Sequence, residues 1–180
     1  MRRKILLSLT LVGVLAAMLA LSGCHSTDVP TQTGNQPTIK TITLYFSDDQ
    51  AMNLVGETRE ITIKPSAQMA SDEAGEIVKE LIAGPKDPGL IATIPADTLL
   101  LGGEVAEGIA TVDFSEELRS NHPGGSSGEL MTLYSLVNSL TEVTGIKQVQ
   151  IQIHGADLDT LAGHVDLTQP LTRDESKIKK

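Results

Sequence analysis

The chain has 180 residues, a formal net charge of −9 and an aromatic content of 2%. This length predicts one domain with short additional segments, and the scarcity of rings means that its core is built mainly from Ile, Leu, Val and Ala. Nucleic-acid binding is disfavoured, because it needs a basic surface and often aromatic side chains on which bases stack.

The first residues have the pattern of an export signal. A basic start, Arg2–Lys4, precedes the uncharged run Ile5–Leu21 and two small residues. The run is nearly long enough to cross a bilayer, so an uncleaved membrane helix is the alternative interpretation. The single cysteine of the chain, Cys24, follows directly in the sequence LSGC. This sequence resembles the bacterial lipobox, in which the cysteine receives a lipid and becomes the first residue of the mature protein.

We therefore expect residues 1–23 to be a lipoprotein signal peptide and Cys24 to be the lipidation site. Two acyl chains make a stable membrane anchor where one does not. Removal of the signal peptide takes away three basic residues and no acid, so the mature charge is −9 − 3 = −12. Anionic membrane surfaces repel such a chain, so the lipid must hold it at the extracytoplasmic face of the cell membrane. Residues 24–37 are polar and aperiodic, which predicts a flexible tether.

Regular patterns begin at Thr38 and continue to Arg173, and residues 174–180 are expected to form a polar C-terminal tail. Alternating apolar residues predict strands, and apolar residues at i, i+3, i+4 and i+7 predict helices. Ser71 is the expected N-cap of the first helix, which Gly84 ends. The expected strands cover about residues 38–46, 58–64, 98–105, 109–114 and 148–153, and the helices about 71–84 and 126–145. The order β-β-α-β-β-α-β predicts an α+β fold, a two-layer single domain with both helices packed on one mixed sheet.

The segment GGSSG around Ser126 fits G-x-S-x-G, the signature of a hydrolase nucleophile. That motif requires a strand that runs directly into the turn, whereas a loop precedes Ser126. Ser126 and Glu129 also have the S-x-x-E spacing of a capping box at the start of a helix. We therefore interpret Ser126 as a helix N-cap, and the sequence predicts no catalytic residue.

Several phrases of the chain resemble the GerMN domain, which is named after a spore-germination protein. They cover about residues 38–173 and read LYFSDDQAMNLVGETREI, KELIAGPKDPGLIATIPADTLLL, GIATVDFSEEL, LYSLVNSLTEVTGIKQVQIQIHG and GHVDLTQPLTR. The resemblance implies a non-enzymatic envelope domain without a cofactor, found in lipoproteins of sporulation and germination and similar in fold to the ring-building motif. The chain has one copy, whereas the founding germination protein has two in tandem.

A metal or small-ligand site is the main rival interpretation. Five candidate ligands lie within thirteen residues, and their imidazole and carboxylate groups suit Zn²⁺ or Ca²⁺: His154, Asp157, Asp159, His164 and Asp166. Their spacing matches no helical H-E-x-x-H pair, and Leu161 occupies a position where an EF-hand loop has Asp or Asn. A polar loop after an edge strand is the favoured interpretation.

Other polar residues also have structural interpretations. Asp48 and Asp49 are expected to cap the turn after the first strand, and Asn138 to bond a neighbouring loop. Asp113 and Ser115 fit a strand-end turn. The glutamines of the last strand, Gln148–Gln152, fit a solvated outer face, although uncharged amides could also contact another protein chain.

The sequence thus predicts a non-enzymatic, membrane-anchored envelope lipoprotein whose domain acts as a scaffold or adaptor in sporulation or germination. Its expected partners are the membrane, through the lipid on Cys24, and other envelope proteins or further copies of itself. An extracytoplasmic lipoprotein that binds a metal or small ligand is the alternative.

Overall fold

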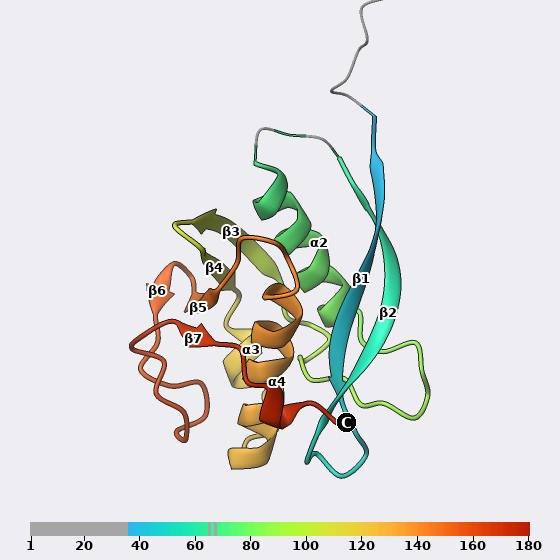
Figure 1. Cartoon of the computed structure of the whole chain (residues 1–180). Coiled ribbons are helices and arrows are strands. Elements are labelled where there is room, and N and C mark those ends of the chain that lie inside the picture. Colours follow the sequence, from blue (N-terminus) through green and yellow to red (C-terminus); the bar gives the residue numbers. More distant parts are fainter. Residues whose placement is uncertain (1–35, 65, 67) are drawn as a thin grey trace, which may run out of the picture. The chain divides into compact units, whose positions relative to one another are not determined.

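A computed structural model describes residues 36–64, 66 and 68–180. The signal peptide, Cys24 and all but the end of the tether lie outside these residues, and the described residues belong to one compact unit. Within the described residues no helix has both the length and the apolar character needed to span a membrane. The elements are β1 (Thr38–Ser47), β2 (Leu54–Ile63), α2 (Met69–Ile82), β3 (Leu100–Ala106), β4 (Ile109–Phe114), α3 (Glu117–Ser120), α4 (Ser126–Leu140), β5 (Gln148–Ile153), β6 (Ala156–Asp157), β7 (Leu171–Thr172) and the 3-10 helix η1 (Glu175–Lys177) (Figure 1).

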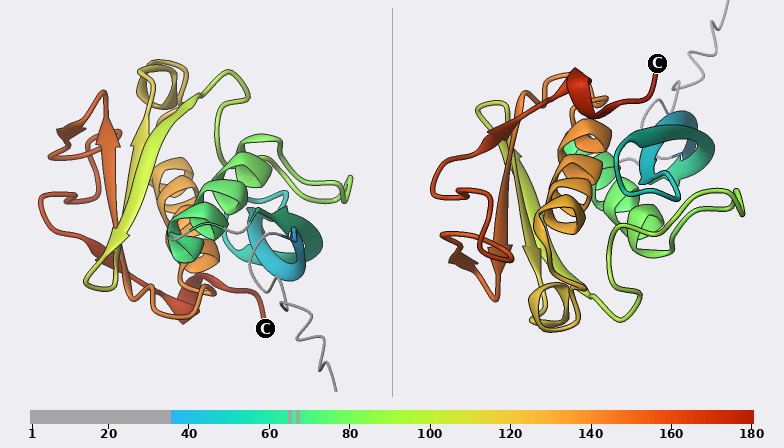
Figure 2. Two further views of the ribbon diagram at one scale, coloured as in Figure 1. Left: turned by 90° about the horizontal axis from the view of Figure 1, so that it is seen from above. Right: turned by 90° about the horizontal axis from the view of Figure 1, so that it is seen from below.

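The described strands form two sheets. β3, β4, β5 and β6 are hydrogen-bonded in that order, β7 also pairs with β5, and the β4–β5 pair is parallel. β1 and β2 form a separate antiparallel hairpin. Figure 2 shows α2 and α4 between the hairpin and the five-stranded sheet. The expected α+β class, with helices packed on a mixed sheet, is confirmed.

The structure differs from the expected single sheet because the hairpin lies on the other side of the helices. The reason is α4, in which ten of fifteen residues are buried. A helix that is buried all round needs cover on more than one side. Ser139 Oγ accepts a hydrogen bond from the Tyr45 amide at 3.0 Å, and Ser135 Oγ donates to the Tyr45 carbonyl at 2.5 Å. Two helix hydroxyls thus satisfy backbone groups at the edge of β1 that a further strand would otherwise satisfy.

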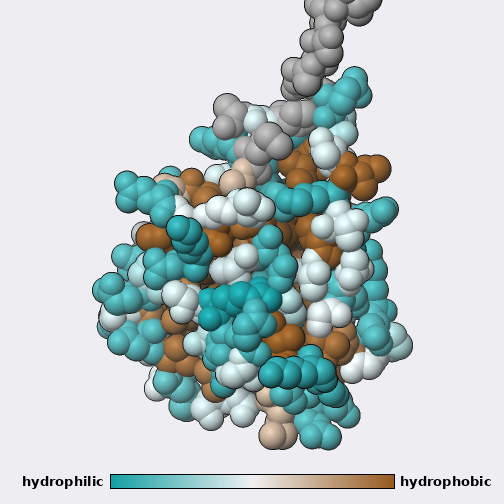
Figure 3. All heavy atoms as spheres, in the orientation of Figure 1, coloured by the Kyte–Doolittle hydropathy of each residue, from teal (hydrophilic) through white to brown (hydrophobic). Residues whose placement is uncertain are grey.

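One continuous hydrophobic core joins the layers. It includes Phe46 from the hairpin, Leu81 from α2, Leu136 from α4 and Val112 and Phe114 from the sheet. Both phenylalanines are fully buried. The unit therefore has its own core, which is the basic requirement for independent folding. On the face drawn in Figure 3, hydrophobic side chains lie scattered among hydrophilic ones.

The start of α2 differs from the expectation. The helix begins at Met69, so Ser71 lies inside its first turn and is not the N-cap. Ser71 Oγ instead accepts a hydrogen bond from the Val105 amide of β3 at 3.0 Å. Serine is common at helix N-caps, but a hydrogen bond to the edge of a distant strand satisfies its hydroxyl equally well.

A buried arginine holds the other end of α2. Arg59 is 4% exposed, and its guanidinium donates to the carbonyls of Glu80 at 3.2 Å and Gly84 at 2.6 Å. It also pairs with the carboxylates of Glu57 at 2.5 Å and Glu80 at 2.8 Å. Because the last carbonyls of a helix lack intrahelical partners and carry negative partial charge, a cation stabilises this end.

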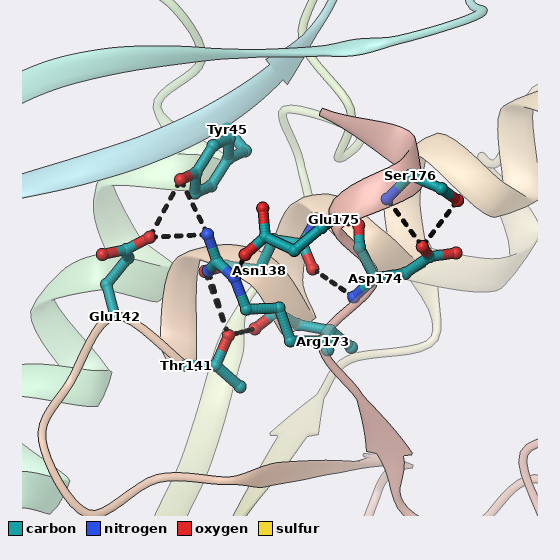
Figure 4. Close-up of polar contacts among 9 residues, drawn as sticks. Tyr45, Asn138, Thr141, Glu142, Arg173, Asp174, Glu175 and Ser176 are labelled. Atoms are coloured by element: carbon teal, nitrogen blue, oxygen red, sulfur yellow. Dashed lines mark hydrogen bonds and ion pairs between the residues drawn. The ribbon is translucent and has the colours of Figure 1, made fainter. Parts of the chain in front are cut away.

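Residues 171–180, here called the C-terminal strap, cross the domain and contact each layer. β7 pairs with β5, and the Arg173 guanidinium lies 2.9 Å from Glu142 and donates to the Tyr45 hydroxyl at 3.0 Å (Figure 4). Further on, the Lys179 amide donates to the Leu54 carbonyl at 2.8 Å. The residues expected to form a polar tail therefore pack against the hairpin.

Candidate functional site: an apolar hollow at the end of the hairpin

The turn between β1 and β2 is organised by Asp48. Its carboxylate accepts hydrogen bonds from the Met52 amide at 3.0 Å and from the Asn53 amide and side chain at 3.3 and 3.0 Å. These bonds, that of Met52 foremost, hold the pKa of Asp48 below its ordinary value. Ala51 adopts a left-handed φ of 53° in this turn, and the Met52 side chain is 66% exposed. Asp48 therefore has the expected turn-forming role.

A second segment, the loop between α2 and β3, joins the end of β1. Ile91 forms an antiparallel bridge with Ser47, whose amide and carbonyl bond the backbone of Ile91 at 3.2 and 2.9 Å. The Glu57 carboxylate steadies the loop by accepting from the amides of Lys86 and Asp87 at 2.9 and 2.8 Å. Ile91 keeps 52% of its surface exposed although its backbone is fixed.

A hollow of about 120 Å³ lies beside Ile91. The turn, the loop and the N-terminal half of α4 contribute its lining, which consists of Ser47, Ala51, Ile91, Ala92, Thr93, Pro123, Gly128, Met131 and Thr132. The polar atoms of the two threonines are engaged: Thr132 Oγ1 donates to the Thr93 carbonyl at 2.5 Å, and Thr93 Oγ1 donates to Ser135 Oγ at 2.7 Å.

His122 adjoins this lining as a neutral ring. Its Nδ1 accepts from the Gly124 amide at 2.9 Å, and Nε2 lies 3.0 Å from Thr132 Oγ1. A ring that accepts at Nδ1 and donates at Nε2 is uncharged, and burial lowers the pKa of His122. The hollow is therefore lined by small and apolar side chains and has no free charge in its lining. Such a site suits an apolar side chain of a partner better than an ion.

A broader depression of about 470 Å³ lies between β2 and α2. Its lining is polar or charged and consists of Thr62, Lys64, Asp72, Glu76 and Lys79.

The five candidate metal ligands have separate surroundings. Asp157 accepts from the Gln152 side chain, Asp166 accepts from Thr168, and the His164 ring lies 3.0 Å from Glu129. Among the described residues, no group of three or more His, Cys, Asp or Glu is arranged to hold a metal ion. His154 adopts a left-handed φ of 51° at the end of β5, and the Asp159 carbonyl accepts from the Leu167 amide at 2.9 Å.

The capping-box interpretation of Ser126 and Glu129 is wrong. Gly125 is the N-cap of α4 without a side-chain cap bond, and Ser126 is an exposed residue of the first turn. Glycine takes the cap because its φ is 77°, a left-handed value that few other residues adopt. In the described part of the chain no histidine forms a hydrogen bond with Ser126, so the structure adds nothing to the nucleophile interpretation.

Glu129 instead organises the loop after β6, a role that the sequence pattern did not reveal. Its carboxylate is fully buried and accepts from the amides of Leu161, Ala162 and His164 at 3.1, 2.8 and 2.8 Å. The Thr160 hydroxyl adds a bond at 2.9 Å. Converging backbone amides form an anion-binding concavity, or nest, and here the anion is a side chain of the same chain.

Comparison with known proteins gives the family. The profile of the family described as "Germane: Sporulation and spore germination" matches residues 43–159. The chain belongs to the Germane family. Both segments that form the exposed rim of the hollow, the β1–β2 turn and the loop around Ile91, lie inside the matched region, whereas the C-terminal strap lies outside it. A search of the curated proteins finds no match.

Solved structures with the same fold include two from the sporulation protein GerM of Bacillus subtilis. Its first GerMN domain is 21% identical to this chain and superposes with a TM-score of 0.56. The match covers 74% of this chain and 98% of that domain. The tandem GerMN domains are 22% identical with a TM-score of 0.53, covering 87% of this chain and 51% of that one. The Germane chain thus spans about half of the tandem protein. A Clostridium perfringens protein described as a candidate lipoprotein is 23% identical and superposes with a TM-score of 0.55. The match covers 76% of this chain and 87% of that one.

Proposed function

We propose that this Germane protein is a lipid-anchored adaptor of the cell envelope that acts in sporulation or germination, without catalysis, by binding another protein. In this proposal Cys24 carries the lipid and holds the protein at the extracytoplasmic face of the membrane. The domain supplies the contact surface, and confinement to the membrane raises its effective concentration for partners on the same surface.

The hollow beside Ile91 is the observation that carries the proposal. Small apolar pockets with an exposed hydrophobic rim are typical places for the anchor side chain of a protein partner. Ile91, which lines the hollow, is 52% exposed although backbone hydrogen bonds to Ser47 fix its loop. Met52, the neighbour of the lining residue Ala51, is 66% exposed in a turn that Asp48 fixes. Because the backbone of this rim is already ordered, a partner loses less binding free energy to ordering the rim than it would on a flexible loop.

The place of the hollow also supports an adaptor. The tether enters the domain at Thr38, and Ser47 lies at the other end of the same strand (Figure 1). Nine residue steps of about 3.3 Å separate these ends by roughly 30 Å. The hollow is therefore presented away from the point of attachment, where a partner can reach it.

Replacement of the anchoring thiol tests the first half of the proposal. The full chain and its Cys24→Ala variant are expressed with labelled palmitate, and the membrane and soluble fractions are compared. We expect label and membrane attachment in the parent and neither in the variant, because one thiol accepts the lipid. Label retained by Cys24→Ala would contradict the lipid assignment while leaving the contact surface to be tested separately.

A further inference from the structure

The outer edge of β2 is unusually long for an unpaired strand edge. β2 has ten residues and pairs with β1 along its whole length. Edges of this kind are normally shortened, covered or interrupted, because their free amide and carbonyl groups bind other strands. The opposite edge of the hairpin is covered by Ser135, Ser139 and Ile91.

The pairing pattern shows which β2 groups point outward. Leu54 lies opposite Ser47, and the backbone of each forms hydrogen bonds outside the hairpin. Leu54 bonds Lys179, and Ser47 bonds Ile91. In an antiparallel pair the outward residues recur every second position. The outward residues of β2 after Leu54 are therefore Gly56, Thr58, Glu60 and Thr62. All four are exposed, and no described residue outside the hairpin bonds their backbone groups.

The C-terminal strap already uses the start of this edge. Ile178 forms a parallel bridge with Leu54, and the Lys179 amide donates to the Leu54 carbonyl at 2.8 Å. The edge therefore accepts added backbone, and among the described residues the strap bonds its first position alone.

We propose that the rest of the edge pairs with the same edge of a second copy, antiparallel and about a twofold axis at Thr58. In this register Gly56 faces Glu60 of the second copy, and Thr58 faces its own counterpart. Three mutually outward pairs then exchange about six backbone hydrogen bonds. The two hairpins become one four-stranded sheet.

Charge favours this register over its neighbours. About Thr58, each Glu57 lies opposite Arg59 of the other copy, so the Glu57–Arg59 pair that is already formed within each copy at 2.5 Å meets the same pair in reverse order and no like charges lie directly opposite. Registers centred on Glu57, Arg59 or Glu60 would place identical charges directly opposite each other, which is destabilising. The segment GETRE is thus complementary to itself when its direction is reversed.

This inference extends the proposed adaptor role but does not rest on the hollow, which lies at a different surface. The test uses the lipid-free unit Gly34–Lys180, which contains no cysteine. Thr58→Cys places two thiols across the axis, where Cα atoms of a bonded pair lie about 5.5 Å apart and a disulfide fits. Thr62→Cys is the matched control, because it lies on the same edge but its two copies would be roughly 25 Å apart.

We expect mild oxidation to convert Thr58→Cys to a covalent dimer at least ten times faster than Thr62→Cys. Equal rates, or faster crosslinking at position 62, would overturn the register.

Sedimentation equilibrium supplies a readout without thiols. Thr58→Pro removes one outward amide and no bond to β1, so it should weaken the dimer at least tenfold more than Thr62→Pro, while both variants melt cooperatively. A parent that stays monomeric up to millimolar concentration would overturn the proposal.

Discussion

The side chain of Asn138 forms a two-way hydrogen bond with the backbone of Asp174. Its amide nitrogen donates to the Asp174 carbonyl at 3.0 Å, and its oxygen accepts from the Asp174 amide at 3.0 Å (Figure 4). Asn138 is fully buried in α4. The expectation that it bonds a neighbouring segment is confirmed, and the segment is the C-terminal strap.

Replacement of Asn138 should therefore release the strap. Asn138→Ala leaves two backbone groups of Asp174 without partners, and we expect the free energy of unfolding to fall by about 2 kcal/mol. Hydrogen exchange should accelerate at Asp174 and Lys179 before it does so in α4. Asn121→Ala removes an exposed amide and is the control, with an expected change below about 0.5 kcal/mol. Unchanged exchange at Lys179 would show that Asn138 does not hold the strap.

Arg59 should be among the most sensitive positions of the domain. Arg59→Met keeps much of the side-chain volume but leaves the Glu57 carboxylate without its cation and two carbonyls without a donor. We expect a loss of about 3–5 kcal/mol, as is usual when one member of a buried ion pair is removed. Arg119→Met is the matched control, because its pair with Glu116 is exposed and 3.7 Å long and should contribute less than about 1 kcal/mol. Similar melting temperatures for the two variants would contradict this role.

Glu129 makes a pH-dependent contribution to stability. Burial alone would raise the pKa of its carboxyl, but hydrogen bonds from Ala162, Thr160 and His164 outweigh burial and hold it below the ordinary value. A carboxyl with a lowered folded-state pKa stabilises the fold fully above its unfolded-state pKa of about 4.3, and this stabilisation disappears as the pH falls through the folded-state pKa.

Glu129→Gln tests this contribution. The side-chain amide has the size of the carboxyl, but its NH2 group faces the backbone N–H donors of the loop. We therefore expect the free energy of unfolding to fall by about 2–3 kcal/mol at pH 7. Thermal melts between pH 3 and pH 7 should show a smaller difference between parent and variant at pH 3 than at pH 7. A difference that does not change with pH would show that the charge of Glu129 is not what the loop binds.

Gly128 allows the hollow to be filled from within α4. A Cβ at this position meets the His122 ring at 3.6 Å, an ordinary contact. Because glycine is a poor helix former, Gly128→Ala should raise stability by about 0.5–1 kcal/mol. Gly128→Leu should occupy the hollow while the domain stays folded, which urea unfolding of both variants would check. Loss of the cooperative transition in either variant would contradict the open geometry of the site.

Local patterns of the sequence predicted much of the fold. The alternation in Ile109–Phe114 and Gln148–Ile153 identified two strands, although not that they pair with each other, and apolar periodicity identified α2 and α4. The start of β2 was missed because Gly56 interrupts the alternation, although pairing with β1 fixes the strand. The separate hairpin was not predictable in this way, since nothing local in β1 shows that helix hydroxyls replace its neighbour.

The candidate site was harder to predict for the same reason. The S-x-x-E spacing suggested a local partner for Glu129, but its partners lie 31 to 35 residues away. The hollow combines a turn, a loop and a helix face, and Ile91 alone gives no pattern that distinguishes it from a core residue. A long-range contact becomes visible only when the chain is folded.

The most direct test of the adaptor role is photo-crosslinking of the full-length lipoprotein in its own cells, with a photoreactive residue at Ile91. A second chain with the same residue at Gln169, which is also exposed, is the control. We expect a discrete adduct with another envelope protein from position 91, none from position 169, and loss of the adduct when Gly128→Leu fills the hollow. Identical adducts from both positions, or an adduct that survives Gly128→Leu, would contradict the proposal that the hollow binds the partner.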